Sequence, residues 1–372
     1  MERVAVVYNA RSGALLARAE AEPGDQLAEL FARHGIRAEL RAFNPGTLAA
    51  DVRELLASRP DALVAAGGDG TARAVAECML GAQVPMGKPR SETLMGVPGS
   101  EVAIGTLGSG NTMGTPDART PMGTPDAEAP SGSPGCAVPM GILPGGTMNV
   151  LARDLGVPTE LEKAVAALAT APVERIDVAT VNGQVFLCSS MLAMLPHIGR
   201  LRERARGGTA RATVPLLGRM LRVLRRYPRM RLTIVVDGRE YQEKTRAMVI
   251  SCNPLSSQAT QATSVKTRSA GAGFKPSPMP GRERLDAGKL AVYVAHDRTR
   301  WDLLAVAAKL FDGSWQRDKR VRAYEGATVE VHAAGSGLLS VMSDGEIAQL
   351  TVPLRYELRP RALAMLAPGA AA

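Results

Sequence analysis

Cysteine, histidine and aromatic residues are scarce in this chain. Its 372 residues include four cysteines, none in CxxC spacing, and four histidines, none in an HExxH pattern. We therefore expect neither a disulfide framework nor a zinc site of these kinds. Aromatic residues make up only 3% of the chain. Few stacking platforms are available for bases, so nucleic acid is not an expected partner.

Long apolar runs are absent as well. No run approaches the roughly 18 residues of a membrane-spanning helix, and the opening run from Val4 to Tyr8 is too short for the core of a signal peptide. With 45% hydrophobic and 22% charged residues, the composition is that of a soluble protein with enough length for two domains. We expect a cytoplasmic location.

The net charge of +9 comes from one segment. Residues Arg200 to Arg231 contain eleven arginines and one acidic residue. Apolar residues recur at helical spacing from Leu216 to Leu224, and the other faces of this helix carry Arg219, Arg222, Arg225 and Arg226. Two interpretations are open: a helix that lies on an anionic membrane surface, and a helix packed on the protein with its arginines in water.

The first 80 residues alternate between strand and helix patterns, which predicts a parallel α/β sheet. Strands are predicted at Arg3 to Tyr8, Ile36 to Phe43 and Asp61 to Ala66, and helices at about Ala14 to His34, Leu48 to Ser58 and Ala72 to Leu80. The third strand runs into the glycine-rich turn Gly67 to Thr71, where amides at a helix N-terminus suit a phosphate. Asp69 among these amides indicates a divalent cation beside the phosphate. The alternative role for Asp69 is a helix cap.

Residues 82–137 break this pattern, being rich in Gly, Pro, Ser and Thr. MGTPDA occurs twice in them, and VPMG flanks them at Val84 to Gly87 and Val138 to Gly141. We expect an inserted, disordered surface segment. Its Gly108 to Thr112 looks like a nucleotide-binding turn but lacks a preceding strand. After the insert, a strand at Pro139 to Leu143 ends in a second glycine-rich turn, Pro144 to Asn149, and two such turns at neighbouring strand ends would form one polyphosphate cradle.

Beyond Pro172 the pattern becomes antiparallel. Asn182-Gly183 favours a hairpin turn between two strands, Arg175 to Val181 and Gln184 to Ser189. Further strands are predicted at Arg231 to Val236, Tyr241 to Ser251, Lys289 to Ala295 and between Val321 and Leu358, with helices near Leu216 to Arg226 and Trp301 to Phe311. Residues 255–282 form a second Ser/Thr/Gly/Pro-rich loop.

Taken together, these motifs resemble the diacylglycerol kinase catalytic-domain family, which includes sphingosine kinases and soluble bacterial lipid kinases. The motifs are the first-strand loop Asn9 to Gly13, GGDGT at Gly67 to Thr71, GILPGGTMNVLARDLGVP at Gly141 to Pro158, RIDVATVNGQVF at Arg175 to Phe186, RLDAGKL at Arg284 to Leu290 and SDGE at Ser343 to Glu346. GGDGT alone is shared with NAD kinases, whereas the ordered set is far more specific.

The resemblance implies an N-terminal α/β nucleotide-binding domain with a parallel sheet, residues 1–172, and a C-terminal antiparallel β-sandwich domain for the lipid, residues 173–355. It implies that residues 356–372 return to the first domain. The implied activity is Mg²⁺-dependent transfer of the γ-phosphoryl group of ATP to a lipid hydroxyl, on a diacylglycerol-like lipid or a sphingoid long-chain base. Such an enzyme would serve phospholipid biosynthesis and other lipid metabolism.

The family's site residues carry over motif by motif. Asp69 and Asp177 would organise Mg²⁺ through water, and Asp344 or Glu346 would accept the proton of the lipid hydroxyl. The implied catalytic set is thus Asp344, Glu346 and Asp69. The implied nucleotide-binding residues are Asn9, Ala10, Arg11, Ser12, Gly13, Gly67, Gly68, Asp69, Gly70, Thr71, Ala72, Arg73, Gly145, Gly146, Thr147 and Asn149.

Three positions depart from the family pattern. Val150 stands where many members have an acid, Ala287 replaces the acid that binds a structural metal in some bacterial members, and Arg41 to Phe43 lack a threonine that often contacts nucleotide. Two alternatives therefore stay open: an NAD-kinase-like phosphotransferase and a nucleotide-binding homologue without catalysis. The implied lipid is buried in a bilayer, so we expect reversible attachment to an anionic membrane through Arg200 to Arg231. The oligomeric state is left open, a homodimer included.

Overall fold

The computed structural model describes residues 1–12, 22–81, 138–204, 218–219, 222–223, 226–256, 280–282, 284–297, 299, 301–302, 305–306, 309, 315, 318–335 and 337–371. The predicted insert, its repeats and its Gly108 to Thr112 turn lie outside these residues, as does most of the 255–282 loop.

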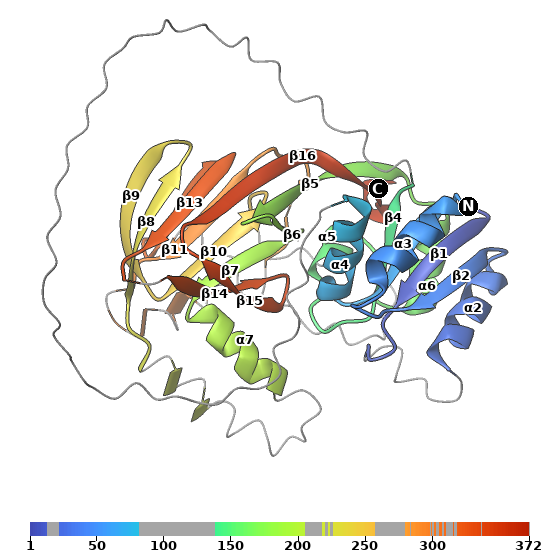
Figure 1. The fold of residues 1–372 in the computed structure, drawn as a ribbon, viewed down its shortest axis with the longest axis horizontal. Helices are drawn as coiled ribbons and strands as arrows, with labels where there is room; N and C mark the ends of the chain where they lie inside the picture. Colours follow the sequence, from blue (N-terminus) through green and yellow to red (C-terminus); the bar gives the residue numbers. More distant parts are fainter. Residues whose placement is uncertain are drawn as a thin grey trace, which may run out of the picture. The chain divides into compact units, whose positions relative to one another are not determined.

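The N-terminal half builds a parallel sheet in the order β2-β1-β3-β4, flanked by helices (Figure 1). Its strands are β1 (Arg3–Tyr8), β2 (Arg37–Ala42), β3 (Ala62–Gly67) and β4 (Met140–Pro144). Its helices are α2 (Pro23–Arg33), α3 (Leu48–Ala57), α4 (Asp69–Met79), α5 (Val150–Asp154) and α6 (Leu161–Ala169). We call these elements the α/β part. Every residue of β3 and β4 is buried. Their continuous apolar runs predicted this burial, because such runs are typical of central parallel strands.

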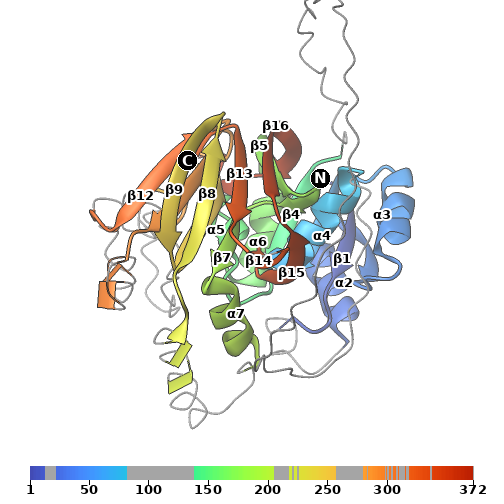
Figure 2. The ribbon, with the colours of Figure 1, turned by 60° about the vertical axis from the view of Figure 1, so that its left-hand side comes forward.

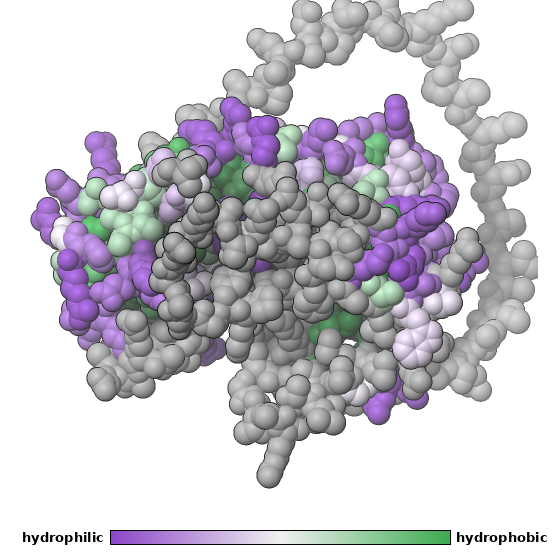
Figure 3. All heavy atoms as spheres, turned by 180° about the vertical axis from the view of Figure 1, so that it is seen from behind, coloured by the Kyte–Doolittle hydropathy of each residue, from purple (hydrophilic) through white to green (hydrophobic). Residues whose placement is uncertain are grey.

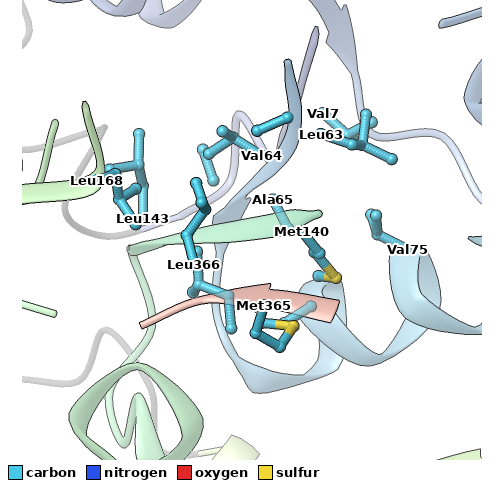
Figure 4. Close-up of a cluster of buried hydrophobic side chains, with 14 of the residues drawn as sticks. Val7, Leu63, Val64, Ala65, Val75, Met140, Leu143, Leu168, Met365 and Leu366 are labelled. Carbon is cyan, nitrogen blue, oxygen red and sulfur yellow. The ribbon is translucent and has the colours of Figure 1, made fainter. Parts of the chain in front are cut away.

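The core of the α/β part lies between this sheet and its helices. Figure 4 shows Leu63, Val64 and Ala65 of β3 beside Met140 and Leu143 of β4, with Met365 and Leu366 from the end of the chain in the same cluster. The chain end reaches this core because the last strand, β16 (Leu354–Leu366), pairs in parallel with β4 at Met365.

The C-terminal half is antiparallel and forms two sheets, and β5–β15 with the first part of β16 make up what we call the β part. The sheet of the α/β part continues through β16, β13 and β8 to β9. Strand β5 pairs with β16, and β6 pairs with β5. The second sheet has the order β12-β11-β10-β7-β14-β15. Their bounds are β5 Val173–Val181, β6 Gln184–Phe186, β7 Ser189–Ala193, β8 Met230–Val236, β9 Arg239–Thr245, β10 Ala247–Cys252, β11 Leu290–Ala295, β12 Val321–Gly326, β13 Thr328–Ala333, β14 Leu338–Ser343 and β15 Glu346–Thr351.

The predicted fold class is confirmed, and several details differ. The predicted strand Gln184 to Ser189 ends at Phe186 as β6, and β7 begins at Ser189 in the other sheet. The predicted single strand from Tyr241 to Ser251 is two strands in different sheets, because the chain leaves β9 at Thr245 and begins β10 at Ala247. The intervening Arg246 forms a buried ion pair with Asp297. Helix α7 (Leu195–Arg204), which packs against β7 and β14 (Figure 2), was not predicted.

The basic segment is described only in part. Arg219, Arg222 and Arg226 are helical and exposed, whereas Val223 and Tyr227 pack with Met194 of β7's end. Leu216, Leu217, Met220, Leu221, Leu224 and Arg225 lie outside the described residues. The described arginines are therefore exposed while Val223 and Tyr227 pack on the protein, which both earlier interpretations allow.

Candidate functional site

Two glycine-rich turns meet at the carboxyl ends of β3 and β4. The Gly145 N–H donates to the Gly67 carbonyl over 2.8 Å. A Cβ at Gly146 would lie 2.6 Å from the Gly68 Cα, so only glycine allows this approach of the two backbones. The predicted joint cradle of the two turns is thus present as a geometric feature.

The first-strand loop closes one side of this pair of turns. The Asn9 N–H donates to the Ala66 carbonyl over 2.9 Å, which holds the loop against the end of β3. The Ser12 hydroxyl is buried and donates to the Gly145 carbonyl over 2.5 Å. Ala10 and Arg11 are exposed, and Gly13 lies outside the described residues.

The remaining predicted nucleotide residues fall into exposed and structural groups. Gly146 and Thr147 are exposed, whereas Thr71 and Ala72 are buried and support the turn from below. Asn149 adopts a left-handed conformation with φ of 45°. Its side chain closes the second turn by accepting from the Gly146 N–H over 2.8 Å and donating to the Gly146 carbonyl over 2.9 Å.

Asp69 lies in the first turn of α4, half-buried beneath the second turn. Its Oδ1 accepts from the Leu151 N–H of α5 over 3.2 Å, so it bridges two helix N-termini. Burial raises the pKa of Asp69 to about 6, and repulsion from Asp344 and Asp154 adds to this rise, while backbone N–H donors oppose it. A cation or phosphate-bound metal at this carboxylate would relieve that cost.

Asp344 is held by the backbone between β6 and β7. Its Oδ2 accepts from the Leu187 N–H over 2.6 Å, and its Oδ1 accepts from the N–H groups of Cys188 and Ser189 over 2.9 and 3.0 Å. Burial raises the pKa of Asp344, and these donors together with the Arg73 guanidinium counter that rise. Asp344 itself occupies the β14–β15 turn with φ of 49°, as the predicted hairpin requires.

Glu346, two residues on, is exposed and reaches the N-terminus of α4. A Cβ at Gly70 would lie 2.7 Å from the Glu346 Oε1, so the carboxylate lies directly against the Gly70 backbone. The DGE turn of the β part therefore meets the GGDGT turn of the α/β part. Arg73 and Glu77 strengthen this junction, since both also contact the backbone of Val185 in β6.

Both carboxylate oxygens of Asp177 accept hydrogen bonds from the backbone. Its Oδ1 accepts from the Arg361 N–H over 2.8 Å and its Oδ2 from the Gly288 N–H over 2.7 Å, and the residue is 1% exposed. It therefore fastens the LDAG loop to the bend within β16. Its role toward Mg²⁺ stays a prediction.

Sequence reasoning missed a buried ion pair beside these acids. The Arg282 Nε donates to the Asp154 Oδ2 over 2.8 Å, and both side chains are 2% exposed. The two residues are 128 positions apart, and Arg282 stands among other charged residues, so no local pattern marks it as buried.

The residues present fit a metal through one carboxylate rather than through a cage. Among the residues that the structure describes, no group of three or more His, Cys, Asp or Glu side chains could hold a metal ion. Asp154 is paired with Arg282 and Asp344 with three amides, which leaves Asp69, with its raised pKa, as the acid best suited to a cation. A metal bound mainly by phosphate oxygens and water is compatible with this arrangement.

Two family models match this chain. Residues 3–181 match the diacylglycerol kinase catalytic domain, and residues 208–367 match the YegS C-terminal NAD kinase beta sandwich-like domain. The chain belongs to the diacylglycerol kinase catalytic-domain family. This kinase family implies ATP as the phosphoryl donor. The binding of its phosphates at the two glycine turns stays a prediction.

Solved structures agree on the fold. A diacylglycerol kinase from Bacillus anthracis str. Sterne is similar with a TM-score of 0.61 and 18% identity, covering 100% of this chain and 99% of that one. Two further solved structures from that organism, described as candidate diacylglycerol kinases, have TM-scores of 0.62 and 0.58 at 17% and 18% identity. The first covers 100% of this chain and 99% of its own, and the second 98% of each.

Proposed function

We propose that this kinase family member transfers the γ-phosphoryl group of ATP to the hydroxyl of a lipid, either a diacylglycerol-like lipid or a sphingoid long-chain base. The observation that supports the proposal is the contact of Glu346 with Gly70, because the exposed carboxylate lies at the N-terminus of α4, where the sequence predicts phosphate binding. Phosphoryl transfer needs this combination of a phosphate cradle and a base near the attacking hydroxyl.

The two acids of the DGE turn have separate roles in this proposal. Glu346 accepts the hydroxyl proton, while the hydroxyl oxygen bonds to the γ-phosphorus and the bond from that phosphorus to the bridging oxygen of ADP breaks. Asp344, fully engaged with three backbone amides, holds the turn and so aims Glu346. Magnesium, when bound beside Asp69, would offset the negative charge of the phosphates.

A lipid panel tests the proposal directly. Purified protein with labelled ATP, Mg²⁺ and mixed micelles of diacylglycerol, monoacylglycerol or sphingosine should yield a phosphorylated lipid. Loss of the base should lower kcat at least ~100-fold in Glu346→Gln, with an unchanged melting temperature because this side chain is exposed. Asp344→Asn should lower both kcat and the melting temperature, since an amide NH₂ would face backbone donors. Absence of product from every lipid would sink the proposal.

One alternative activity has an observation in its favour. The C-terminal match is to an NAD kinase beta sandwich-like domain, and GGDGT occurs in that class too. The same preparation is therefore incubated with NAD and ATP without lipid. Formation of NADP, with no lipid product, would replace the lipid kinase proposal. ATP-dependent thermal stabilisation without any turnover would indicate a homologue that has lost catalysis.

A further inference from the structure

The segment Leu187–Ser189 is held on both of its faces. Its three N–H groups all point to Asp344, and the Asp344 N–H returns a bond to the Ser189 carbonyl over 3.0 Å. The position of Asp344, and with it the DGE turn, therefore depends on where this short backbone segment lies.

The guanidinium of Arg282 binds the same segment from the other side. Its Nη1 donates to the Leu187 carbonyl over 2.6 Å and to the Cys252 carbonyl over 2.9 Å, and its Nη2 lies 3.6 Å from the Cys188 Sγ. Cys252 in turn donates its N–H to the Cys188 carbonyl over 2.9 Å. A planar fork with several donors can make these contacts together, whereas the point charge of lysine cannot.

A fourth contact of Arg282 joins it to the α/β part. Its Nε donates to Asp154 at the end of α5, and α5 begins with the amides that hold Asp69. One buried side chain thus joins the helix behind Asp69 to the backbone that holds Asp344. Burial of the pair at 2% exposure keeps water from replacing either contact.

We infer that Arg282, fixed by Asp154, is a positioning residue that sets the Leu187–Ser189 backbone and thereby aims Asp344 and Glu346 at the phosphate-binding turns. This inference rests on the proposed kinase function for its kinetic consequence. Both side chains are only 2% exposed, so loss of the Arg282 guanidinium should misplace the base without weakening nucleotide binding. Misplacement of a reacting group by about 1 Å can cost on the order of 100-fold in rate.

The test compares Arg282→Lys with Arg246→Lys. Arg246 is a matched control because it also pairs with a buried aspartate, Asp297, but in the β part away from the DGE turn. On a short-chain soluble lipid analogue, Arg282→Lys should lower kcat at least ~10-fold with the KM for ATP within about 2-fold. Arg246→Lys should keep kcat within about 2-fold. Equal losses in both variants, or an unchanged kcat in Arg282→Lys, overturn the inference.

Amide hydrogen exchange provides a readout that does not depend on turnover. In Arg282→Lys the amides of Leu187, Cys188 and Ser189 should exchange at least ~10-fold faster, while the β8–β9 amides keep their protection. Unchanged protection of these three amides overturns the inference, even if kcat falls. If Arg282→Lys fails to fold, Asp154→Asn takes its place, because it keeps an oxygen acceptor for the Nε. A wild-type protein inactive on every lipid refutes the proposed function. The exchange data still decide whether Arg282 sets the Leu187–Ser189 backbone.

Discussion

Glu346 and Asp344 are separated by one glycine yet meet opposite surroundings. The left-handed turn at Asp344 and Gly345 points one carboxylate into the β part and leaves the other at the surface beside α4. Residue type alone could not have assigned the base, because both residues are acids and both belong to the same SDGE motif. Our proposal assigns the base to Glu346, since an acid that accepts hydrogen bonds from three amides is poorly placed to take a proton from a mobile substrate.

Gly70→Ala tests the contact between the two parts at a single atom. The new Cβ would lie 2.7 Å from the Glu346 Oε1, so the carboxylate must move away. We expect kcat to fall at least ~10-fold. The melting temperature should stay level or rise, since alanine favours a helix over glycine by up to about 1 kcal/mol. Gly337→Ala is the control, because nothing lies within 4 Å of its Cβ. A fully active Gly70→Ala would contradict the assigned role of Glu346.

Asp69 makes stability depend on pH in a direction opposite to a salt-bridged acid. Its pKa is about 6 in the folded protein against an ordinary aspartate value of 3.8, so between these pH values the folded state binds more protons. Stability should therefore fall as pH rises through this window. Without divalent cations, Asp69→Asn should be more stable than wild type by up to about 3 kcal/mol at pH 7.5, and the difference should vanish near pH 4.

Thermal melts in chelator at both pH values measure this effect. Asp25→Asn is the control, since Asp25 also stands in the first turn of a helix but is exposed. A destabilised Asp69→Asn at pH 7.5 would show that Asp69 is ionised at no cost, and would remove the reason to place a cation there.

At the scale of elements, the glycine turns explain why so much of the site could be predicted from sequence. A glycine-rich turn after a buried strand needs no distant partner to be recognised, and Gly67, Gly70 and Gly146 all prove to be sites of close approach. The Arg282–Asp154 pair could not be predicted in this way, because its two residues are 128 positions apart and only the fold brings them together. Likewise β9 and β10 read as one strand, because an exposed-looking Arg246 gives no sign of its buried partner.

The basic segment is the element that the membrane prediction concerns. Val223 and Tyr227 pack inward and Arg219, Arg222 and Arg226 face outward, so the arginines are free to meet an anionic surface. Each such arginine contributes about 1 kcal/mol near an anionic bilayer at low salt. Changing these three to Gln should weaken binding to phosphatidylglycerol vesicles at least ~10-fold, measured by co-sedimentation.

A matched control separates this site from net charge. Arg37, Arg53 and Arg239 are exposed elsewhere on the protein, and changing them to Gln removes the same charge. Binding of the wild-type protein to the vesicles should fall steeply with salt, as screening over about 8 Å predicts. The variant changed at Arg219, Arg222 and Arg226 should keep its activity on a soluble lipid analogue. Equal losses in both triple variants would favour the other interpretation, a helix packed on the protein with its arginines in water.

Within the part of the chain that the structure describes, no helix has the length and apolar character needed to span a membrane.

At the scale of the whole molecule, one sheet runs through both parts. Strand β16 pairs with β13, then with β5, and finally with β4, so the chain end closes the sheet that its beginning started. The hairpins at Asn182-Gly183 and Asp237-Gly238 could be predicted because their turn residues are local signals. The shared sheet could not be predicted, since strand order depends on contacts between residues hundreds of positions apart.

The described back face (Figure 3) is largely hydrophilic. Among all the described residues, Val173, Trp301 and Leu338 are the exposed large hydrophobic ones.

The predicted insert can be removed in a way that this sheet makes specific. Strand β4 begins at Met140 in the second VPMG, where Leu63 of β3 donates its N–H to the Pro139 carbonyl over 3.0 Å. Deleting residues 88–141 joins the first VPMG to Ile142, so an identical tetrapeptide takes the place of the lost one. Helix α4 ends at Met79, which leaves a short connection of ordinary length.

We expect the shortened chain to fold, to bind ATP and to keep kcat within about 3-fold, because shortening a loop changes closure entropy only slowly with length. Thermal shift with ATP and the lipid assay measure both properties. The control is deletion of residues 84–141, which removes both VPMG copies and should unfold the α/β part, since β4 would lose Met140 and the Pro139 carbonyl that pairs with Leu63. Aggregation of both deletions would show that the segment is structural, whereas folding of both would show that β4 tolerates a foreign start.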